Sequence, residues 1–324
     1  MPEPPTLVRR GRPSRIGAAV AVLLAVTGYV VVDYVSGGKP APRCEVVSAN
    51  SREGAGASYE FTAEQAENAA TVAAVGTSRG MPERGVTIAL ATALQESGLY
   101  NISHGDRDSL GLFQQRPSQG WGNERQIMDP AYSAARFYAH LDKVPGYSRL
   151  PLTVAAQRVQ RSGFPQAYAK HEPDAALLAA ALTGRAPAAF TCEGRPVAAA
   201  GDPAKVRAAL DRDFGAGTVP GSARSGNARS GKASGGERGR TLAVPVYATR
   251  AGTDGGAPQR GWELAHWAVA HSSALRIERV SYAGREWSAD AAGNEWRRTS
   301  AAGAGKGGEG GDRGADEVRI VTAQ

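Results

Sequence analysis

The sequence predicts a mainly α-helical domain followed by a small α+β domain, with one membrane-spanning helix ahead of both. Three observations predict this fold class. Apolar residues recur at helical spacing between residues 58 and 195, segments typical of strands and helices alternate after residue 241, and one long uncharged run precedes them. A chain of 324 residues has room for about two domains.

The N-terminal end is typical of a membrane anchor. The basic tail 1–15 contains four arginines, and seventeen uncharged residues follow at Ile16–Val32. As a helix this run would be roughly 26 Å long, which is enough to span a bilayer. We expect a transmembrane signal anchor at 16–35, with the N-terminus in the cytoplasm and the bulk of the chain outside, because positive charge precedes the span. A cleaved secretory signal is the alternative, and it also exports the rest of the chain.

The net charge of +7 indicates attraction to anionic surfaces. Much of the positive charge lies in the tail and in a Gly/Ser-rich basic linker at 196–240. Since no nucleic-acid-binding motif occurs, an anionic wall or membrane surface is a better partner for an exported chain than nucleic acid. One hydrophobic segment cannot form a solute path alone, which argues against a transporter.

Two cysteines, Cys44 and Cys192, flank the region of helical pattern. In the oxidising compartment expected for an exported chain, they are predicted to form a disulfide. The bond would close a loop of about 150 residues and stabilise the fold by up to roughly 5 kcal/mol. Two unpaired thiols are the alternative. Cysteines this far apart do not indicate a zinc site, and we expect no metal and no cofactor.

A tether at 36–57, rich in Gly, Ser, Pro and Ala, precedes the helical domain, 58–195. Thr62 and Gln65 form a capping-box pattern at the start of the first helix. The next helix carries an apolar stripe and ends at Gly98.

Residues 101–123 lose this periodicity and predict a loop or short hairpin lobe. Asp129 is the predicted N-cap of another helix, and two more follow, the last interrupted near Pro173. Within the linker, 203–214 has the pattern of a short amphipathic helix.

Strand-like and helix-like segments resume in the C-terminal domain, 241–324. A low-complexity run at 300–315 predicts a disordered insertion within it.

One carboxylate, Glu96, lies where the apolar stripe before Gly98 ends. Cleaving a glycosidic bond needs a carboxylic acid that keeps its proton near neutral pH, and a partly apolar pocket provides this by raising the pKa. Most glutamates near helix ends are solvated surface charges, so the position of Glu96 alone does not indicate catalysis.

The motifs around Glu96 resemble those of the lysozyme-like fold shared by soluble lytic transglycosylases and goose-type lysozymes. The stretch QESGLYN places Ser97 directly after Glu96, and GLFQ at 111–114 matches a Gly-Leu-Met-Gln motif with Phe in place of Met. The resemblance covers roughly residues 58–190. It implies that Glu96 is the general acid, that Ser97 supports its orientation, and that Gln114 lines the cleft beneath an N-acetyl sugar.

The segment GDR contains Asp106, which resembles the goose-type lysozyme aspartate that positions the attacking water. Arg116 replaces a second acid of that family. If Asp106 and Glu96 lie about 6.5–9.5 Å apart with room for water, inverting hydrolysis is expected. If Glu96 acts alone, the 6-hydroxyl of the sugar attacks and gives an anhydro product, as in the transglycosylases. An aspartate in such a loop is also a common turn residue.

Three aromatic residues are candidates for stacking on sugar rings, namely Tyr100, Trp121 and Tyr168. In the related families a tyrosine from a late helix reaches the acid, and Tyr168 is placed for that role. Packing in the core or in the polar lobe explains each of the three equally well.

The segment GWELAHWAVAHSSALRIERVSYAGREWSA resembles a small domain of exported actinobacterial wall proteins, distantly similar to zinc D-Ala-D-Ala peptidases. Those peptidases take a pair of metal-binding histidines from the last core strand, where this chain has ADEVRIVTA. His266 and His271 are five residues apart on a helix and cannot share a metal. We therefore interpret this domain as degenerate and metal-free.

These patterns predict a membrane-tethered muralytic enzyme that cleaves β-1,4 glycosidic bonds in the glycan strands of peptidoglycan during cell-wall remodelling. The alternative is a non-catalytic peptidoglycan-binding or wall-assembly module that keeps the same cleft. A peptidase within 240–324 is a third hypothesis, and it would require zinc.

Overall fold

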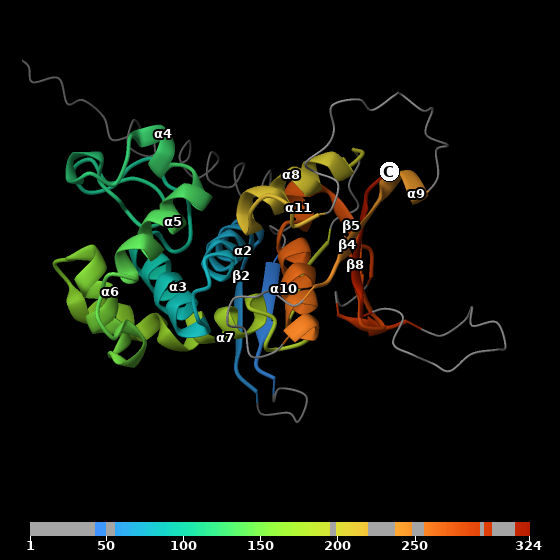
Figure 1. Ribbon diagram of the computed structural model, residues 1–324, viewed down its shortest axis with the longest axis horizontal. Helices are drawn as coiled ribbons and strands as arrows, with labels where there is room; N and C mark the ends of the chain where they lie inside the picture. Colours follow the sequence, from blue (N-terminus) through green and yellow to red (C-terminus); the bar gives the residue numbers. More distant parts are fainter. Residues whose placement is uncertain are drawn as a thin grey trace, which may run out of the picture. The chain divides into compact units, whose positions relative to one another are not determined.

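The computed structural model describes residues 43–49, 56–194, 199–219, 237–247, 256–291, 295–299 and 315–324 (Figure 1). The predicted tail and signal anchor lie outside these residues, as do much of the basic linker and nearly all of the predicted insertion. Within the described part of the chain, no helix combines the length and the apolar character that a membrane span needs. The N-terminal anchor stays a prediction.

The first part of the described chain is mostly helical, as the periodicity predicts. Its helices are α2 (Ala63–Ser78), α3 (Glu83–Ser97), η2 (Pro117–Gln119), α4 (Glu124–Ile127), α5 (Pro130–Leu141), η3 (Tyr147–Arg149), α6 (Leu152–Gln160), η4 (Pro165–His171) and α7 (Glu172–Leu182). Helix α2 lies among α3, α5 and α7 and is buried over most of its length.

Local sequence signals set the helix ends. The Thr62 side chain accepts a hydrogen bond from the Gln65 N–H, and the Gln65 side chain accepts one from the Thr62 N–H, so the predicted capping box is confirmed. Asp129 caps α5 as predicted. Gly98 ends α3 in the left-handed conformation, with φ of 64°. The predicted interruption near Pro173 is the change from η4 to α7, which begins at Glu172.

A small antiparallel sheet lies beside the helices. Its strands are β1 (Arg43–Val47), β2 (Ser58–Thr62) and β3 (Phe190–Cys192), in the order β2-β1-β3. Cys44 is directly opposite Cys192 in the β1–β3 ladder, and the two form the predicted disulfide.

Residues 43–47 fall in the predicted tether, so that prediction was wrong for them. They form a strand because they pair with segments that follow later in the chain, which local composition does not reveal.

The C-terminal part is the predicted α+β region. Its elements are α8 (Pro203–Phe214), α9 (Glu237–Arg240), β4 (Thr241–Pro245), α10 (Gly256–Ala270), α11 (Ser272–Leu275), β5 (Ile277–Tyr282), β6 (Arg285–Ser288), β7 (Arg297–Arg298) and β8 (Glu317–Thr322). The strands form one antiparallel sheet in the order β4-β8-β5-β6-β7. Alternate residues such as Val244, Val280 and Ile320 are buried, as expected for a sheet with one face packed on a helix.

Helix α10 joins the two parts of the chain. It packs against α2, α7 and β3 as well as against β5 and β8 (Figure 1). The described residues from Arg43 onward therefore form one compact unit with a shared hydrophobic core, although the sequence pattern divides them into two domains.

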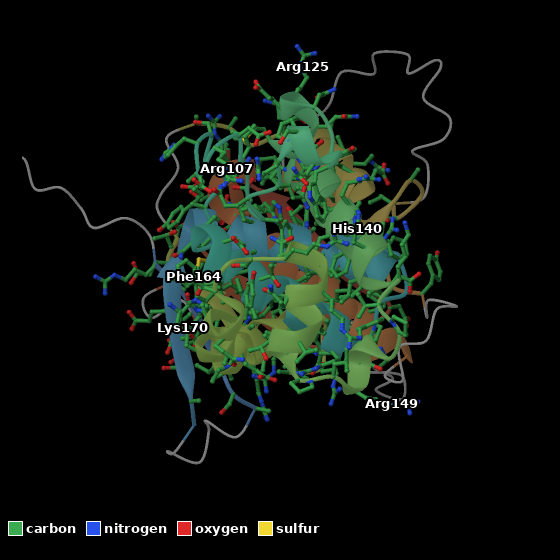
Figure 2. The ribbon with its side chains drawn as sticks, turned by 90° about the vertical axis from the view of Figure 1, so that its left-hand side faces the viewer. Arg107, Arg125, His140, Arg149, Phe164 and Lys170 are labelled. Atoms are coloured by element: carbon green, nitrogen blue, oxygen red, sulfur yellow. A yellow bond between two sulfur atoms is a disulfide. The ribbon has the colours of Figure 1, made fainter. Side chains whose placement is uncertain are left out.

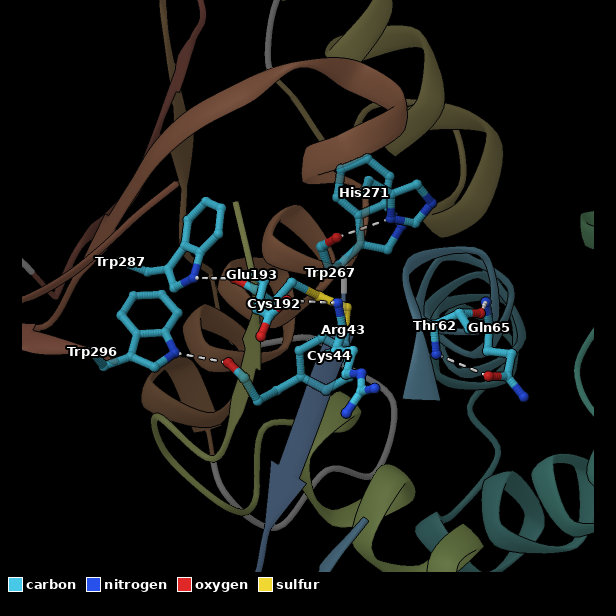
Figure 3. The surroundings of a disulfide bond; sticks show 11 residues. Arg43, Cys44, Thr62, Gln65, Cys192, Glu193, Trp267, His271, Trp287 and Trp296 are labelled. Atoms are coloured by element: carbon cyan, nitrogen blue, oxygen red, sulfur yellow. Dashed lines mark hydrogen bonds between the residues drawn. A yellow bond between two sulfur atoms is a disulfide. The ribbon is translucent and has the colours of Figure 1, made fainter. Parts of the chain in front are cut away.

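The C-terminal part also supplies hydrogen-bond donors to the edge of β3 that faces away from β1. Trp287 Nε1 donates to the Cys192 carbonyl at 3.2 Å, and Trp296 Nε1 donates to the Phe190 carbonyl at 2.9 Å (Figure 3). Both indoles are buried, as expected for core tryptophans. An unpaired strand edge would otherwise leave buried carbonyl groups unsatisfied.

Trp296→Phe should lower the free energy of unfolding by about 1–3 kcal/mol, because the buried Phe190 carbonyl loses its donor. The control is Trp262→Phe, which makes the same change of side chain in the ring that packs 5.1 Å away and breaks no bond to β3. Urea unfolding measures the free energy of unfolding of both variants. Equal losses of stability in the two variants would contradict a role for the indole donor.

His266 should make stability depend on pH. Complete burial lowers its pKa from 6.5 to about 4, and its Nδ1 donates to the Ala181 carbonyl at 2.8 Å. Below about pH 6.5 the unfolded chain gains a proton that the folded protein does not, so stability falls as pH falls toward 4, by about 3 kcal/mol from this group.

The test compares unfolding of wild type and His266→Gln from pH 7.5 to pH 4. The variant should lose less stability than wild type over this range, whatever its stability at pH 7.5.

Candidate active site

Glu96 lies in the last turn of α3 and is half-buried. The Tyr168 hydroxyl, from η4, donates to its Oε1 at 2.7 Å. Burial raises the pKa of Glu96, while hydrogen bonds from Tyr168 and Gln160 oppose that rise. A carboxyl group in this setting can hold a proton closer to neutral pH than a solvated glutamate does.

Two side chains of α2 bind the backbone just after Glu96. Gly98 and Leu99 both adopt left-handed backbone conformations with φ of 64°. The Gln65 side chain donates to the Gly98 carbonyl at 2.7 Å, and the Asn68 side chain donates to the Leu99 carbonyl at 2.9 Å. These bonds fix the helix end that carries the acid.

One direct hydrogen bond joins the two motifs named from the sequence, and a second ties the later motif to α6. Ser97 Oγ donates to the Leu112 carbonyl at 2.8 Å, and Gln160 Nε2 donates to the Phe113 carbonyl at 2.7 Å. Phe113 is fully buried and stacks on Phe137 with ring centroids 4.8 Å apart. Phe113, which stands in place of the Met of the motif, is therefore a core residue. The Leu112 and Phe113 carbonyls tie the loop to α3 and α6.

Gln114 follows Phe113 in a left-handed conformation with φ of 47°. It is half-buried, and its Nε2 donates to the Gly111 carbonyl at 3.2 Å. A Cβ at Gly105 would overlap Gln114 Oε1, so glycine is needed there for the amide to lie against the loop. The predicted cleft residue is thus held by the loop 101–115.

Asp106, the predicted second carboxylate, points into solvent. Its side chain is 93% exposed and lies 3.9 Å from the Arg107 guanidinium. The anchored carboxylate of this loop is Asp108, which accepts from Arg116 Nε at 2.7 Å and from the Ser118 N–H at 2.8 Å. The Arg116 hydrogen bond, with those from Ser118, holds the pKa of Asp108 well below its usual range. Asp108 is an ionised structural group, and Asp106 has the setting of a turn residue.

The predicted sugar-stacking residues are largely engaged in packing. Tyr168 is buried and hydrogen-bonds the acid, so it offers no open ring face. Trp121 lies against His140 with ring centroids 4.3 Å apart. The Tyr100 hydroxyl lies 3.4 Å from Thr62 Oγ1, and its side chain is half-buried.

Two residues near the acid were missed in the sequence. Gln160 at the end of α6 donates to the Phe113 carbonyl and lies close enough to Glu96 to lower the pKa of its carboxyl. Ser162, in the loop that follows, lies close enough to Tyr168 to lower the pKa of its hydroxyl. Neither belongs to a motif, so only the packing of α6 beside α3 identifies them.

The described residues contain no group of three or more His, Cys, Asp or Glu side chains arranged to hold a metal ion. Asp213, a fully buried carboxylate, accepts hydrogen bonds from Thr71 at 3.1 Å and from the Trp267 indole at 2.9 Å, with His271 Nε2 at 3.6 Å. Arg212 of α8, whose side chain is half-exposed, also donates to Asp213 Oδ1, at 2.7 Å. These contacts join α2, α8 and α10.

Comparison with known proteins covers only the C-terminal part. Residues 204–308 match a family model described as VldE, C-terminal domain. The match spans less than half of the chain, begins in α8 and ends before β8. No curated protein matches the chain. The resemblance to lysozyme-like enzymes stays a prediction, as does the distant resemblance to zinc peptidases.

Tyr168→Phe should raise the pKa of Glu96 further, because it removes a donor that favours the ionised carboxylate while burial remains. Carboxyl ¹³C chemical shifts followed through a pH titration measure this directly. Tyr132→Phe removes the hydroxyl that donates to the Trp121 carbonyl and should leave the Glu96 titration unchanged. A lower Glu96 pKa in Tyr168→Phe would contradict the assigned hydrogen bond.

Proposed function

We propose that the protein is a membrane-tethered muralytic enzyme that cleaves the β-1,4 bond between N-acetylmuramic acid and N-acetylglucosamine. The observation that carries the proposal is the half-buried Glu96 carboxyl, whose pKa is raised by burial and whose Oε1 accepts from Tyr168. The hydrogen bond from Ser97 to the Leu112 carbonyl supports it as well, because it connects the two motifs on which the family resemblance rests.

The proposed chemistry uses Glu96 twice. The protonated carboxyl gives its proton to the glycosidic oxygen as the C1–O bond breaks, and an oxocarbenium-like centre develops at C1 of the muramic residue. The 6-hydroxyl of the same sugar then attacks C1, and its proton returns to the Glu96 carboxylate. The product is a 1,6-anhydro sugar, and the enzyme returns to its starting state with no water consumed.

The setting of the loop carboxylates favours this route over hydrolysis. Inverting hydrolysis needs a second carboxylate that activates a water on the opposite face of the sugar. Asp106 is 93% exposed, and Asp108 is bound to Arg116 and Ser118. Neither has the enclosed position of a general base, so we assign lytic transglycosylase-type cleavage rather than lysozyme-type hydrolysis.

Location outside the cytoplasm belongs to the same proposal. The disulfide between Cys44 and Cys192 fits an oxidising compartment. The signal anchor at 16–35 would hold the enzyme at the cell membrane, facing the glycan strands. The C-terminal part supports the helical part by packing and hydrogen bonding, and we assign it no separate catalytic role.

Glu96→Gln should abolish the release of soluble fragments from purified peptidoglycan while the thermal midpoint stays equal or rises. An amide cannot donate the proton, yet it avoids the burial penalty of a carboxylate and can still accept from Tyr168. Glu317→Gln, on strand β8, is the matched control and should digest as wild type does. Mass spectrometry of the wild-type products should find anhydro ends, which are lighter than reducing ends by one water.

Three outcomes separate the hypotheses. A Glu96→Gln variant that digests like wild type contradicts the enzyme assignment. Reducing ends in place of anhydro ends would replace transglycosylase chemistry with hydrolysis. Wild-type protein that binds glycan strands in a pull-down but releases no fragments would identify the non-catalytic wall-binding module.

A further inference from the structure

Phe164 is the most exposed large hydrophobic side chain among the described residues, at 78%. It lies in the loop between α6 and η4, on the face of the helical part shown in Figure 2. Single exposed apolar residues are common on protein surfaces and need no function. What distinguishes Phe164 is how its backbone is held and what that backbone is connected to.

The loop holds Phe164 from both sides. The Phe164 N–H donates to Ser162 Oγ at 3.1 Å, and Gln157 Nε2 donates to the Ser162 carbonyl at 2.8 Å. The Phe164 carbonyl accepts a hydrogen bond from the Ala167 N–H at 3.1 Å, at the start of η4. The ring is therefore presented to solvent by a fixed backbone, which lowers the entropy lost when a ligand stacks on it.

One short helix connects this loop to the acid. Phe164 is the residue directly before η4, and Tyr168 of η4 donates to Glu96 Oε1 at 2.7 Å. Helix η4 also packs against α3, which carries Glu96. A glycan that extends from Glu96 along the start of η4 would therefore approach the exposed ring.

The surroundings of Phe164 suit a sugar better than a protein partner. Exposed neighbours in the chain are polar or small, including Arg161, Gly163 and Gln166. A protein interface generally has a buried apolar core made of several side chains, which one ring among polar groups does not provide. The C–H face of an N-acetylhexosamine ring needs only one aromatic face, and its hydroxyl and amide groups suit a polar rim.

We infer that Phe164 is a glycan-binding platform that stacks on an N-acetylhexosamine ring next to the bond presented to Glu96. The inference rests on the proposed function for the position of the scissile bond. Binding of the sugar at Phe164 does not itself require turnover, so the two can be tested separately.

The binding experiment uses the full-length chain carrying Glu96→Gln, with chitotetraose as the probe and isothermal titration calorimetry as the readout. Adding Phe164→Ala should weaken binding about tenfold, a typical loss for truncating a central aromatic contact. Adding Phe164→Trp should preserve binding. Tyr247→Ala removes another exposed aromatic, 66% exposed in the C-terminal part, and should leave binding unchanged.

The same substitutions are then measured on peptidoglycan digestion with Glu96 intact. Phe164→Ala should raise the apparent KM about tenfold with a smaller change in kcat, because the ring binds the substrate away from the reacting atoms. If the wild-type protein digests peptidoglycan and Phe164→Ala has the same KM and the same affinity, Phe164 is not a glycan-binding platform. The enzyme assignment is unaffected by that result. If wild type releases nothing yet Phe164→Ala still weakens binding, the platform stands without the enzyme. An absence of binding to the Glu96→Gln protein overturns the platform.

Discussion

The outer edge of strand β3 is satisfied by donors from the C-terminal part of the chain, and the helical part depends on this pairing. The Phe190 and Cys192 carbonyls accept from two buried indoles, while the other edge of β3 pairs with β1 and carries the disulfide. Strand β3 follows α7, and α7 packs against α3, which carries Glu96. Because buried carbonyls without donors cost free energy, the C-terminal part completes the structure that supports the acid.

Two opposing effects act on the pKa of Glu96. Burial alone would favour a protonated Glu96, whereas donors from Tyr168 and Gln160 favour the ionised form. Burial also raises the pKa of Tyr168, as do the charge of Glu96 and their shared hydrogen bond, so the hydroxyl keeps its proton and remains a donor. In the proposed reaction Glu96 releases a proton and then recovers it. Both effects are needed for this, since either one alone would make one of the two steps too costly.

Elements with local signals were predictable from the sequence, and elements that depend on distant partners were not. The caps at Thr62 and Asp129 act within one helical turn, so three or four consecutive residues are enough to predict them. Strand β1 pairs with residues about 150 positions later, and the composition around 43–47 is that of a tether. The disulfide was an exception, because a chain with two cysteines offers a single internal pairing.

The same distinction applies to the site. Glu96 and Ser97 are adjacent and belong to a recognisable motif, so they could be named from the sequence. Gln160 reaches the acid only because α6 packs beside α3, and nothing in its own neighbourhood marks it. Aromatic residues pose the opposite difficulty, since many are visible in the sequence and most of them pack into the core. Tyr168 is fully buried, whereas the Phe164 ring is 78% exposed while its backbone N–H is bonded to Ser162 Oγ. A ring held away from the core at a fixed position is what a flat, partly apolar ligand requires, and only three-dimensional structure separates such a ring from its buried counterparts.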